Sequence, residues 1–100
     1  MPRTFNTNKD GGCWTEEIKK AVWNKGRVIS DYDSNVWRRD KCGLAMKFSE
    51  YGNRNSDFGW EVDHINPVVN GGRDELSNLQ PLNWKNNVDK ADKLNWTCPQ

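Results

Sequence analysis

The residues of this chain that could do chemistry gather around its single histidine. Asp63 and His64 are adjacent, Asn78 follows fourteen residues after the histidine, and Asn87 follows nine residues after that. Carboxylate and amide oxygens are hard donors that suit Mg²⁺ or Mn²⁺. A neutral imidazole can take a proton from water near neutral pH. These residue types suit metal-dependent hydrolysis of a phosphodiester, and the alternative is a histidine that is only a hydrogen-bonded structural residue.

Two strands and a helix must position these residues. Apolar and polar residues alternate from Trp60 to Asp63, which predicts a half-buried strand over 60–65 that Pro67 ends. A long loop with turn residues precedes a second short strand over 79–82. Asn83 can cap a helix over 84–94. In that helix, four apolar residues are expected to face inward: Trp84, Val88, Ala91 and Leu94.

The first half of the chain predicts a helix and a strand that support this region. Thr15 is a suitable N-cap for a helix over 15–25, with two glutamates in its first turn and Gly26 where the helix ends. Asp33 could cap a short second helix that carries residues 36–39. A strand is expected over 44–48, followed by a loop over 50–58.

Four motifs in the second half form a specific combination. They are Glu61-Val62-Asp63-His64-Ile65-Asn66-Pro67, Gly71-Gly72, Asn78-Leu79-Gln80-Pro81-Leu82 and Asn86-Asn87-Val88-Asp89-Lys90. This pattern resembles the HNH endonuclease family, the ββα-metal nucleases, in the variant with Asn as the last signature residue. The resemblance covers about residues 60–92, and residues 36–43 also look like the segment that precedes this core in small HNH proteins.

The resemblance implies a fold class and a domain layout. We expect an α+β chain, a small single domain in which an N-terminal helix precedes a ββα-metal core. The layout is a flexible N-terminal segment over 1–14, helical and strand support over 15–59, the HNH core over 60–94 and a tail over 95–100.

The resemblance also implies roles for five residues of this sequence. His64 matches the general base that activates water, and Asp63 matches the metal ligand directly before it. Asn78 matches the central asparagine, which ties the loop between the strands and so helps to orient the base. Asn87 matches the second metal ligand, and Lys90 a frequent lysine that faces phosphate. The implied products carry 5′-phosphate and 3′-hydroxyl ends.

The sequence departs from the family at the zinc-binding positions. Many members brace the fold with a structural zinc held by two CxxC pairs, but only Cys42 remains here, and Ala45, Asn83 and Asn86 occupy the other three positions. We therefore expect no structural zinc, with tryptophan packing and the N-terminal helix stabilising the fold instead. Metal-site histidines of other members are also absent, which favours Mg²⁺ or Mn²⁺. Asn86 is an alternative ligand to Asn87.

Length and composition restrict the chain to one small domain. It has 100 residues, a mass of 11.6 kDa and a hydrophobic fraction of 34%, and six of its eleven aromatic residues are tryptophans. We expect the tryptophans, Trp60 and Trp84 first, to form the core, and a platform for unpaired bases is the alternative. The net charge of +1 argues against a polybasic tail, and no stretch approaches the roughly 20 apolar residues of a membrane span.

The three cysteines fit neither a disulfide framework nor a metal pair. Cys13, Cys42 and Cys98 are an odd number at spacings of 29 and 56 residues, so we expect reduced, partly buried thiols. The N-terminal residues are polar and lack the apolar stretch of a signal peptide. We therefore expect a cytoplasmic location.

Two classes of function remain open. The first is a metal-dependent endonuclease acting on DNA, most simply duplex DNA, by nicking or cutting. The second is a DNA-binding or interaction module that keeps the scaffold without turnover, within a phage or defence assembly. Five cations are candidate DNA contacts: Arg38, Arg39, Arg73, Lys85 and Lys90. The sequence leaves open the target site, the oligomeric state, the biological role and any protein partner such as an inhibitor.

Overall fold

The computed structural model describes residues 5–99 and contains helices and antiparallel strands in one small domain. The α-helices are α1 (Glu16–Trp23) and α2 (Trp84–Lys90). The strands are β1 (Arg27–Val28), β2 (Trp37–Arg39), β3 (Ala45–Lys47), β4 (Trp60–His64) and β5 (Leu79–Asn83). Single 3₁₀ turns lie at Phe48–Glu50, Val68–Asn70 and Leu76–Asn78. The expected α+β class with an N-terminal helix is confirmed.

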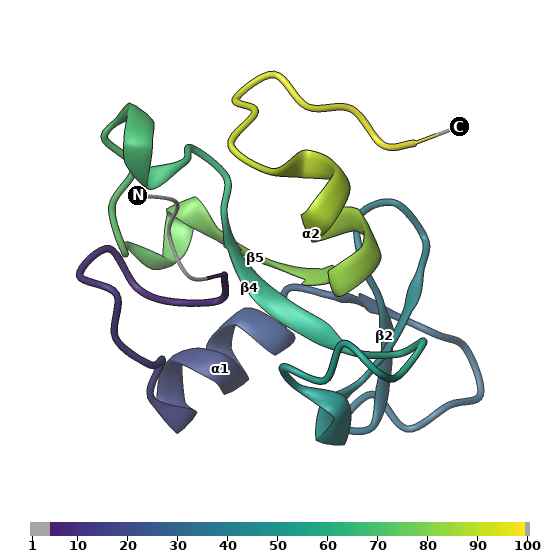
Figure 1. The fold of residues 1–100 in the computed structure, drawn as a ribbon. Helices are drawn as coiled ribbons and strands as arrows, with labels where there is room; N and C mark the ends of the chain where they lie inside the picture. The colour runs from purple at the N-terminus through teal and green to yellow at the C-terminus, as the bar shows by residue number, and fades with distance from the viewer. Residues whose placement is uncertain (1–4, 100) are drawn as a thin grey trace.

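The strands form two separate antiparallel sheets. One has the order β1, β2, β3, and the other pairs β4 with β5, so that Trp60 lies opposite Asn83 and His64 opposite Leu79. β4 and β5 cross the centre of the molecule, with α1 on one side and α2 on the other (Figure 1). The strand, loop, strand and helix order expected for the second half is therefore present.

Local sequence signals explain α1. The hydroxyl of Thr15 accepts a hydrogen bond from the Ile18 amide, and the two glutamates of the first turn complement the positive end of the helix dipole. The helix buries Val22 and Trp23 against the rest of the protein. The expected helix over 15–25 is confirmed with slightly shorter bounds.

The expected short helix after Asp33 is wrong, because this segment enters a strand instead. The Asp33 side chain accepts from the Asn35 amide and its carbonyl accepts from Val36 and Trp37, which makes a tight turn. The chain then pairs with β1 and β3 as strand β2. An Asx turn and a helix cap share the same local signal, and the sheet partners decide between them.

Strand β4 and helix α2 lie where expected, but they bury different residues. All five residues of β4 are buried, including Glu61 and Asp63, where a half-buried strand was expected. Helix α2 ends at Lys90 instead of residue 94, and Val88 and Leu94 are 52% and 54% exposed. The inner face of α2 is polar because it packs on the polar residues of β4.

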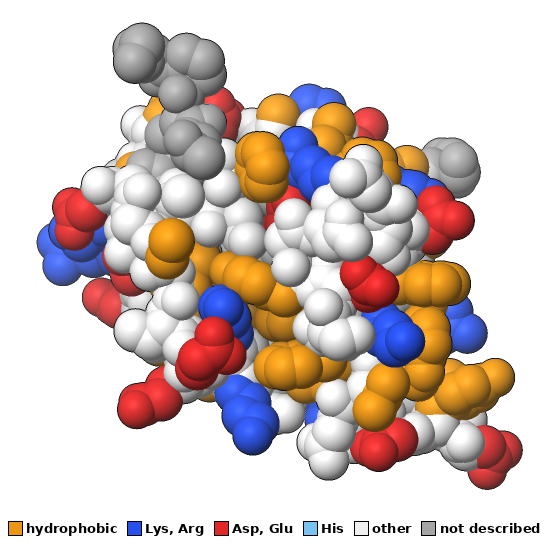
Figure 2. All heavy atoms as spheres, turned by 60° about the horizontal axis from the view of Figure 1, so that its bottom comes forward, with side chains coloured by type: hydrophobic (Ala, Val, Ile, Leu, Met, Phe, Trp, Pro, Cys, Tyr) orange, Lys and Arg blue, Asp and Glu red, His pale blue; other side chains and the backbone are white. Residues whose placement is uncertain are grey.

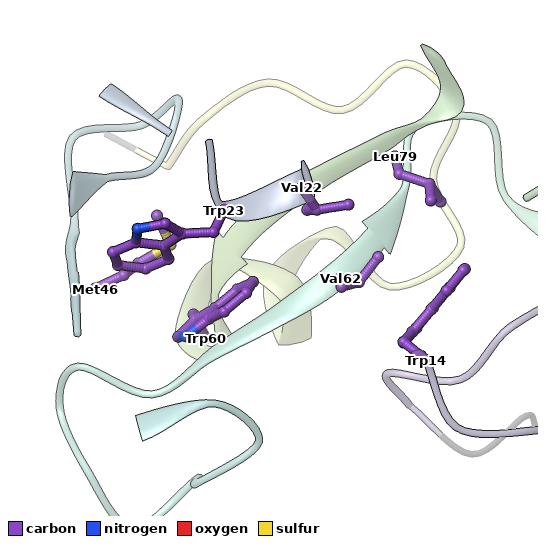
Figure 3. Close-up of a cluster of buried hydrophobic side chains, with 7 residues drawn as sticks. All are labelled: Trp14, Val22, Trp23, Met46, Trp60, Val62 and Leu79. Atoms are coloured by element: carbon purple, nitrogen blue, oxygen red, sulfur yellow. The ribbon is translucent and has the colours of Figure 1, made fainter. Parts of the chain in front are cut away.

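In the part of the chain that the structure describes, the core cluster contains three tryptophans among its seven buried hydrophobic residues (Figure 3). Its buried members are Trp14, Val22, Trp23, Met46, Trp60, Val62 and Leu79. The rings of Trp23 and Trp60 lie 5.0 Å apart, and each ring N–H donates to a backbone carbonyl. The prediction for Trp60 is confirmed. Trp84 is only partly buried and lies outside this cluster. Its ring N–H donates to the Ser56 carbonyl.

A buried carboxylate joins three of the positions where the resembling family carries zinc-binding cysteines. Asp40 is 1% exposed and accepts from four donors: the amides of Cys42, Leu44 and Asn83 and the side chain of Asn86. The Asn83 side chain donates to the Ala45 carbonyl, the fourth position. Asn86 therefore points into this hydrogen-bonded cluster.

The prediction of reduced, partly buried cysteines is wrong for two residues, and for Cys13 it holds for the free thiol but not for its burial. Cys42 and Cys98 form a disulfide, whereas Cys13 is free and exposed. The tail after α2 folds back over the helix and brings the two Cα atoms to 5.5 Å (Figure 1). A spacing of 56 residues could not reveal this proximity, because the path of the tail is set by tertiary packing.

The surface is mixed in character. On the face drawn in Figure 2, acidic and basic side chains are interspersed with hydrophobic ones, in keeping with the net charge of +1. Within residues 5–99, neither helix has the length and apolar character needed to cross a membrane.

Candidate functional site

His64 ends strand β4 and is held on two sides. Its side chain is 9% exposed, and its Nε2 lies 2.8 Å from Oδ1 of Asp74. The ring of Trp14 packs beside it, with ring centroids 5.5 Å apart. An ionised carboxylate only accepts hydrogen bonds, so Nε2 donates to Asp74 and Nδ1 keeps its lone pair. The histidine is thus arranged to accept a proton at Nδ1.

Asn78 ties the loop between β4 and β5. Its side-chain oxygen accepts from the Asn66 amide, and its nitrogen donates to the carbonyls of Asn66 and Arg73. The same loop requires glycine at position 72, because a Cβ there would lie 1.7 Å from the backbone oxygen of Asn66. These bonds set the path of the loop immediately before Asp74. The geometry matches the loop-tying role expected of Asn78, and a contribution of this residue to catalysis stays a prediction.

Asp63 is a buried carboxylate with two neighbours. Gln80 donates to its Oδ2 at 2.9 Å, and the Lys90 ammonium lies 3.3 Å from its Oδ1. Burial raises the pKa of Asp63, although the hydrogen bond from Gln80 and the charge of Lys90 act in the opposite direction. Lys90 is itself buried and donates to the His64 carbonyl. The expectation that Lys90 faces phosphate is therefore wrong, because the ammonium points into the protein.

Asn87 projects from α2 toward β4. Its Nδ2 donates to Oε1 of Glu61 at 2.8 Å. Glu61 is fully buried and also receives a bidentate pair of hydrogen bonds from Arg54, at 2.8 and 2.9 Å. The Asn87 amide is thereby fixed at its nitrogen end.

Asp63, His64 and Asn87 line one pocket of about 290 Å³. The other walls come from Arg54, Val62, the start of the loop after β4, the end of α2 and three N-terminal residues: Phe5, Asn6 and Thr7. The structure therefore brings together the expected base and both expected metal ligands. Asn78 does not line the pocket and instead bonds to the backbone of the loop between β4 and β5, and Asn86 lies in the Asp40 cluster.

The N-terminal residues contact the site from Phe5 onward. The Asn6 side chain accepts from the Val62 amide and from the Tyr51 hydroxyl, and the Lys9 amide donates to both oxygens of Asp74. A flexible segment was expected over 1–14, and residues 1–4 of it lie outside the described residues. The residues from Phe5 onward instead form specific hydrogen bonds to the strand and to the partner of His64.

Asp63 and Asn87 are the residues that could hold a metal ion. Within residues 5–99, no group of three His, Cys, Asp or Glu side chains is close enough to form a metal centre by itself. Asp63 and Asn87 instead offer a carboxylate oxygen and an amide oxygen from β4 and α2, and Asp92 adds a second carboxylate to the lining of the pocket. Such a donor set fits a hard divalent ion that keeps other positions for water and phosphate.

The other cations expected at DNA lie at different places. Arg38 is half-buried and donates to backbone carbonyls, and Arg39 is exposed in the three-stranded sheet. Lys85 pairs with Asp57 on the surface. Arg73 is exposed in the loop that carries the partner of His64.

Sequence reasoning missed three residues of the site: Asp74, Glu61 and Arg54. Asp74 lies in a polar loop, and its contact with His64 depends on how that loop closes. Glu61 alternates with apolar residues in β4, which indicated a solvent-facing position. Only the packing of α2 over β4 shows that this polar face is buried.

Comparison with known proteins identifies one family over this region. Residues 47–93 match a family model described as HNH endonuclease. Neither the search of curated proteins nor the search of solved structures gave a match. The matched segment runs from the end of β3 past the end of α2 and includes Asp63, His64, Asp74, Asn78 and Asn87.

Proposed function

We propose that the chain is a divalent-metal-dependent endonuclease that hydrolyses DNA, on the premise that its residues 47–93 match a family model described as HNH endonuclease. The observation that carries the proposal is the meeting of Asp63, His64 and Asn87 on the wall of one pocket, with Asp74 bound to the histidine.

In this proposal His64 is the general base. Nε2 donates to Asp74, so Nδ1 takes the proton from the attacking water. The water oxygen forms a bond to phosphorus as the bond between phosphorus and the 3′ oxygen breaks. The departing 3′ oxygen takes a proton from a solvent water, so the products are a 5′-phosphate and a 3′-hydroxyl, and His64 later releases its proton to solvent. Asp74 holds the ring orientation and stabilises the imidazolium that forms, as a carboxylate does in other histidine pairs.

Asp63 and Asn87 would hold a divalent ion, with Mg²⁺ or Mn²⁺ the ions that suit these oxygen donors. When bound, the ion supplies stabilisation of the negative charge that develops on the phosphate and on the departing oxygen. Asn78 contributes by fixing the loop that presents Asp74 to the base. This role is a positioning role and involves no direct contact with substrate.

Double-stranded DNA is the proposed substrate. Arg73 is the candidate phosphate contact that the structure favours, because it is exposed in the loop beside Asp74. Arg39, in β2, and Lys85, in α2, are also exposed and remain candidates. Lys90 is not proposed, since its ammonium is buried against Asp63 and the His64 carbonyl.

Conversion of supercoiled plasmid to nicked or linear form tests the proposal. Purified protein with Mg²⁺ or Mn²⁺ is expected to cleave, and EDTA is expected to stop it. His64→Ala should lower the rate by about 10²-fold or more, and Asp74→Asn by about 10-fold or more. Glu17→Gln, an exposed change on α1, should leave the rate unchanged.

Two results would contradict this function. Equal cleavage by His64→Ala would remove the base from the mechanism. Binding of duplex DNA without cleavage under any divalent metal would favour the non-catalytic module instead.

A further inference from the structure

Glu61 is an unusual residue for the centre of a small domain. It is the second residue of β4, opposite Leu82, and none of its surface is exposed. Burying a carboxylate carries a large desolvation cost, and an apolar residue of similar volume at such a position often makes a protein as stable or more stable. The packing of β4 therefore does not explain why a carboxylate stands here.

Both oxygens of Glu61 are engaged by one guanidinium. Arg54 donates from Nε to Oε2 and from Nη2 to Oε1. The Phe5 ring covers the guanidinium, with its centroid 3.4 Å from the central carbon. A bidentate pair of this kind fixes the plane of the carboxylate as well as its position. Glu61 is therefore a rigid acceptor that faces α2.

The third bond to Glu61 comes from Asn87, whose Nδ2 donates to Oε1 at 2.8 Å. An ionised carboxylate only accepts hydrogen bonds, so the nitrogen end of the Asn87 amide must face Glu61. The oxygen and nitrogen of an amide lie on opposite arms of one planar group. With the nitrogen held by Glu61, Oδ1 is directed away from Glu61.

The direction of this amide matters because Asn87 lines the pocket together with Asp63. An amide that presents oxygen can bind a cation, whereas one that presents its N–H groups repels it. Arg54 and Asn87 both donate to Oε1 of Glu61, so without Glu61 the Arg54 guanidinium would be left as a charged group beside the Asn87 amide. Arg54 has only donors and would attract the amide oxygen, which would turn the nitrogen of Asn87 toward the pocket.

We infer that Glu61 is a positioning residue that holds the Asn87 amide with its oxygen available to a divalent cation in the pocket. The inference deepens the proposed function and rests on it, because it assigns the cation site to Asp63 and Asn87. Glu61 itself makes no contact with the ion. Its effect on the ion passes through the orientation of one side chain.

The test measures the affinity of the whole protein for Mn²⁺ from the electron paramagnetic resonance signal of the unbound ion. Glu61→Met removes the acceptor and keeps a long unbranched side chain. The same change is then made in an Asn87→Asp background. A carboxylate at position 87 presents oxygen on both arms, so it has no wrong orientation for Glu61 to prevent.

In the wild-type background, Glu61→Met is expected to weaken Mn²⁺ binding by about 10-fold or more, the usual effect of removing a residue that orients a metal ligand. In the Asn87→Asp background, the same change should cost less than about 3-fold. Loss of the Glu61 charge acts in both backgrounds, and in the Asn87→Asp background the change also relieves repulsion between two adjacent carboxylates. The difference between the two costs is therefore read together with the exchange of the Asn87 amide protons described below. Glu17→Gln removes a distant carboxylate and should leave the affinity unchanged.

The outcomes separate this inference from the proposed function. A wild-type protein without Mn²⁺ affinity overturns both. A wild-type protein that binds Mn²⁺, with Glu61→Met either harmless or equally costly in the two backgrounds, overturns the inference alone. A difference confined to the wild-type background supports it.

A measurement on the wild-type protein keeps the test decisive even if Glu61→Met does not fold. The side-chain amide protons of Asn87 should exchange slowly with solvent, and should continue to do so while Mg²⁺ shifts the signal of the Asn87 side-chain carbonyl carbon. Fast exchange, or a carbonyl signal unmoved by saturating Mg²⁺, would contradict the inference.

Discussion

Breaking the Cys42–Cys98 disulfide should remove a large part of the stability of this domain. The two cysteines are 56 residues apart, and in the chain-entropy model a cross-link closing a loop of that length stabilises the folded state by about 4 kcal/mol. Small domains have a total unfolding free energy of about 5–15 kcal/mol. Cys98→Ser is therefore expected to cost about 2–4 kcal/mol, within the range measured when native disulfides are removed.

Urea denaturation followed by tryptophan fluorescence provides the measurement, with and without a phosphine reductant. The reductant should lower the stability of the wild-type protein by nearly the amount that Cys98→Ser does. It should leave Cys98→Ser itself unchanged, because no disulfide remains to be reduced. Cys13→Ser is the matched control, since Cys13 is free and exposed, and this variant should behave as the wild type does.

The reasoning would be refuted by a wild-type protein whose denaturation midpoint is the same with and without reductant. In that case the tail is not joined to the Asp40 cluster in solution, or the joining does not stabilise the fold. A Cys98→Ser variant that responds to reductant would equally contradict it.

Three further predictions follow from buried polar groups. Because burial raises the pKa of Asp63 above 3.8, the stability of the wild type relative to Asp63→Asn should fall as the pH rises through the folded pKa, as measured by urea titrations at several pH values. Burial also raises the pKa of Tyr51 from 10.0 to about 12. A Tyr32→Phe variant keeps Tyr51 as its one tyrosine, so its phenolate absorbance should rise near that higher pH. The stability that the protonated Tyr51 hydroxyl contributes should be lost as the pH rises through the folded pKa. Asp40→Ala leaves four donors unpartnered and should cost about 3–5 kcal/mol in thermal or urea unfolding, whereas the exposed Asp10→Ala should cost little.

Local signals in the sequence were enough for most of the secondary structure. The helix after Thr15 and the strands at Trp60 and Leu79 follow from capping and alternation, which act between residues close in the chain. The segment after Asp33 was misjudged, because a helix cap and an Asx turn look alike until the sheet partners of β2 are known.

The buried polar residues were the least predictable part of the site. Glu61 and Lys90 belong to types that normally face solvent, and their burial depends on the packing of α2 over β4. The same packing exposes Val88, which the helical pattern had placed inside. A short helix can pack with its polar side inward and its apolar side in solvent when the surface beneath it is polar.

By itself the sequence determined which residues are chemically able to act: one histidine, an adjacent aspartate and two asparagines at the spacing of an HNH domain. Residue type and spacing persist in any conformation of the chain. The tertiary structure alone decided the partners of those residues, namely Asp74 on His64 and Glu61 on Asn87. Such partners lie 10 and 26 residues away, and only loop closure and helix packing bring their atoms within hydrogen-bond distance.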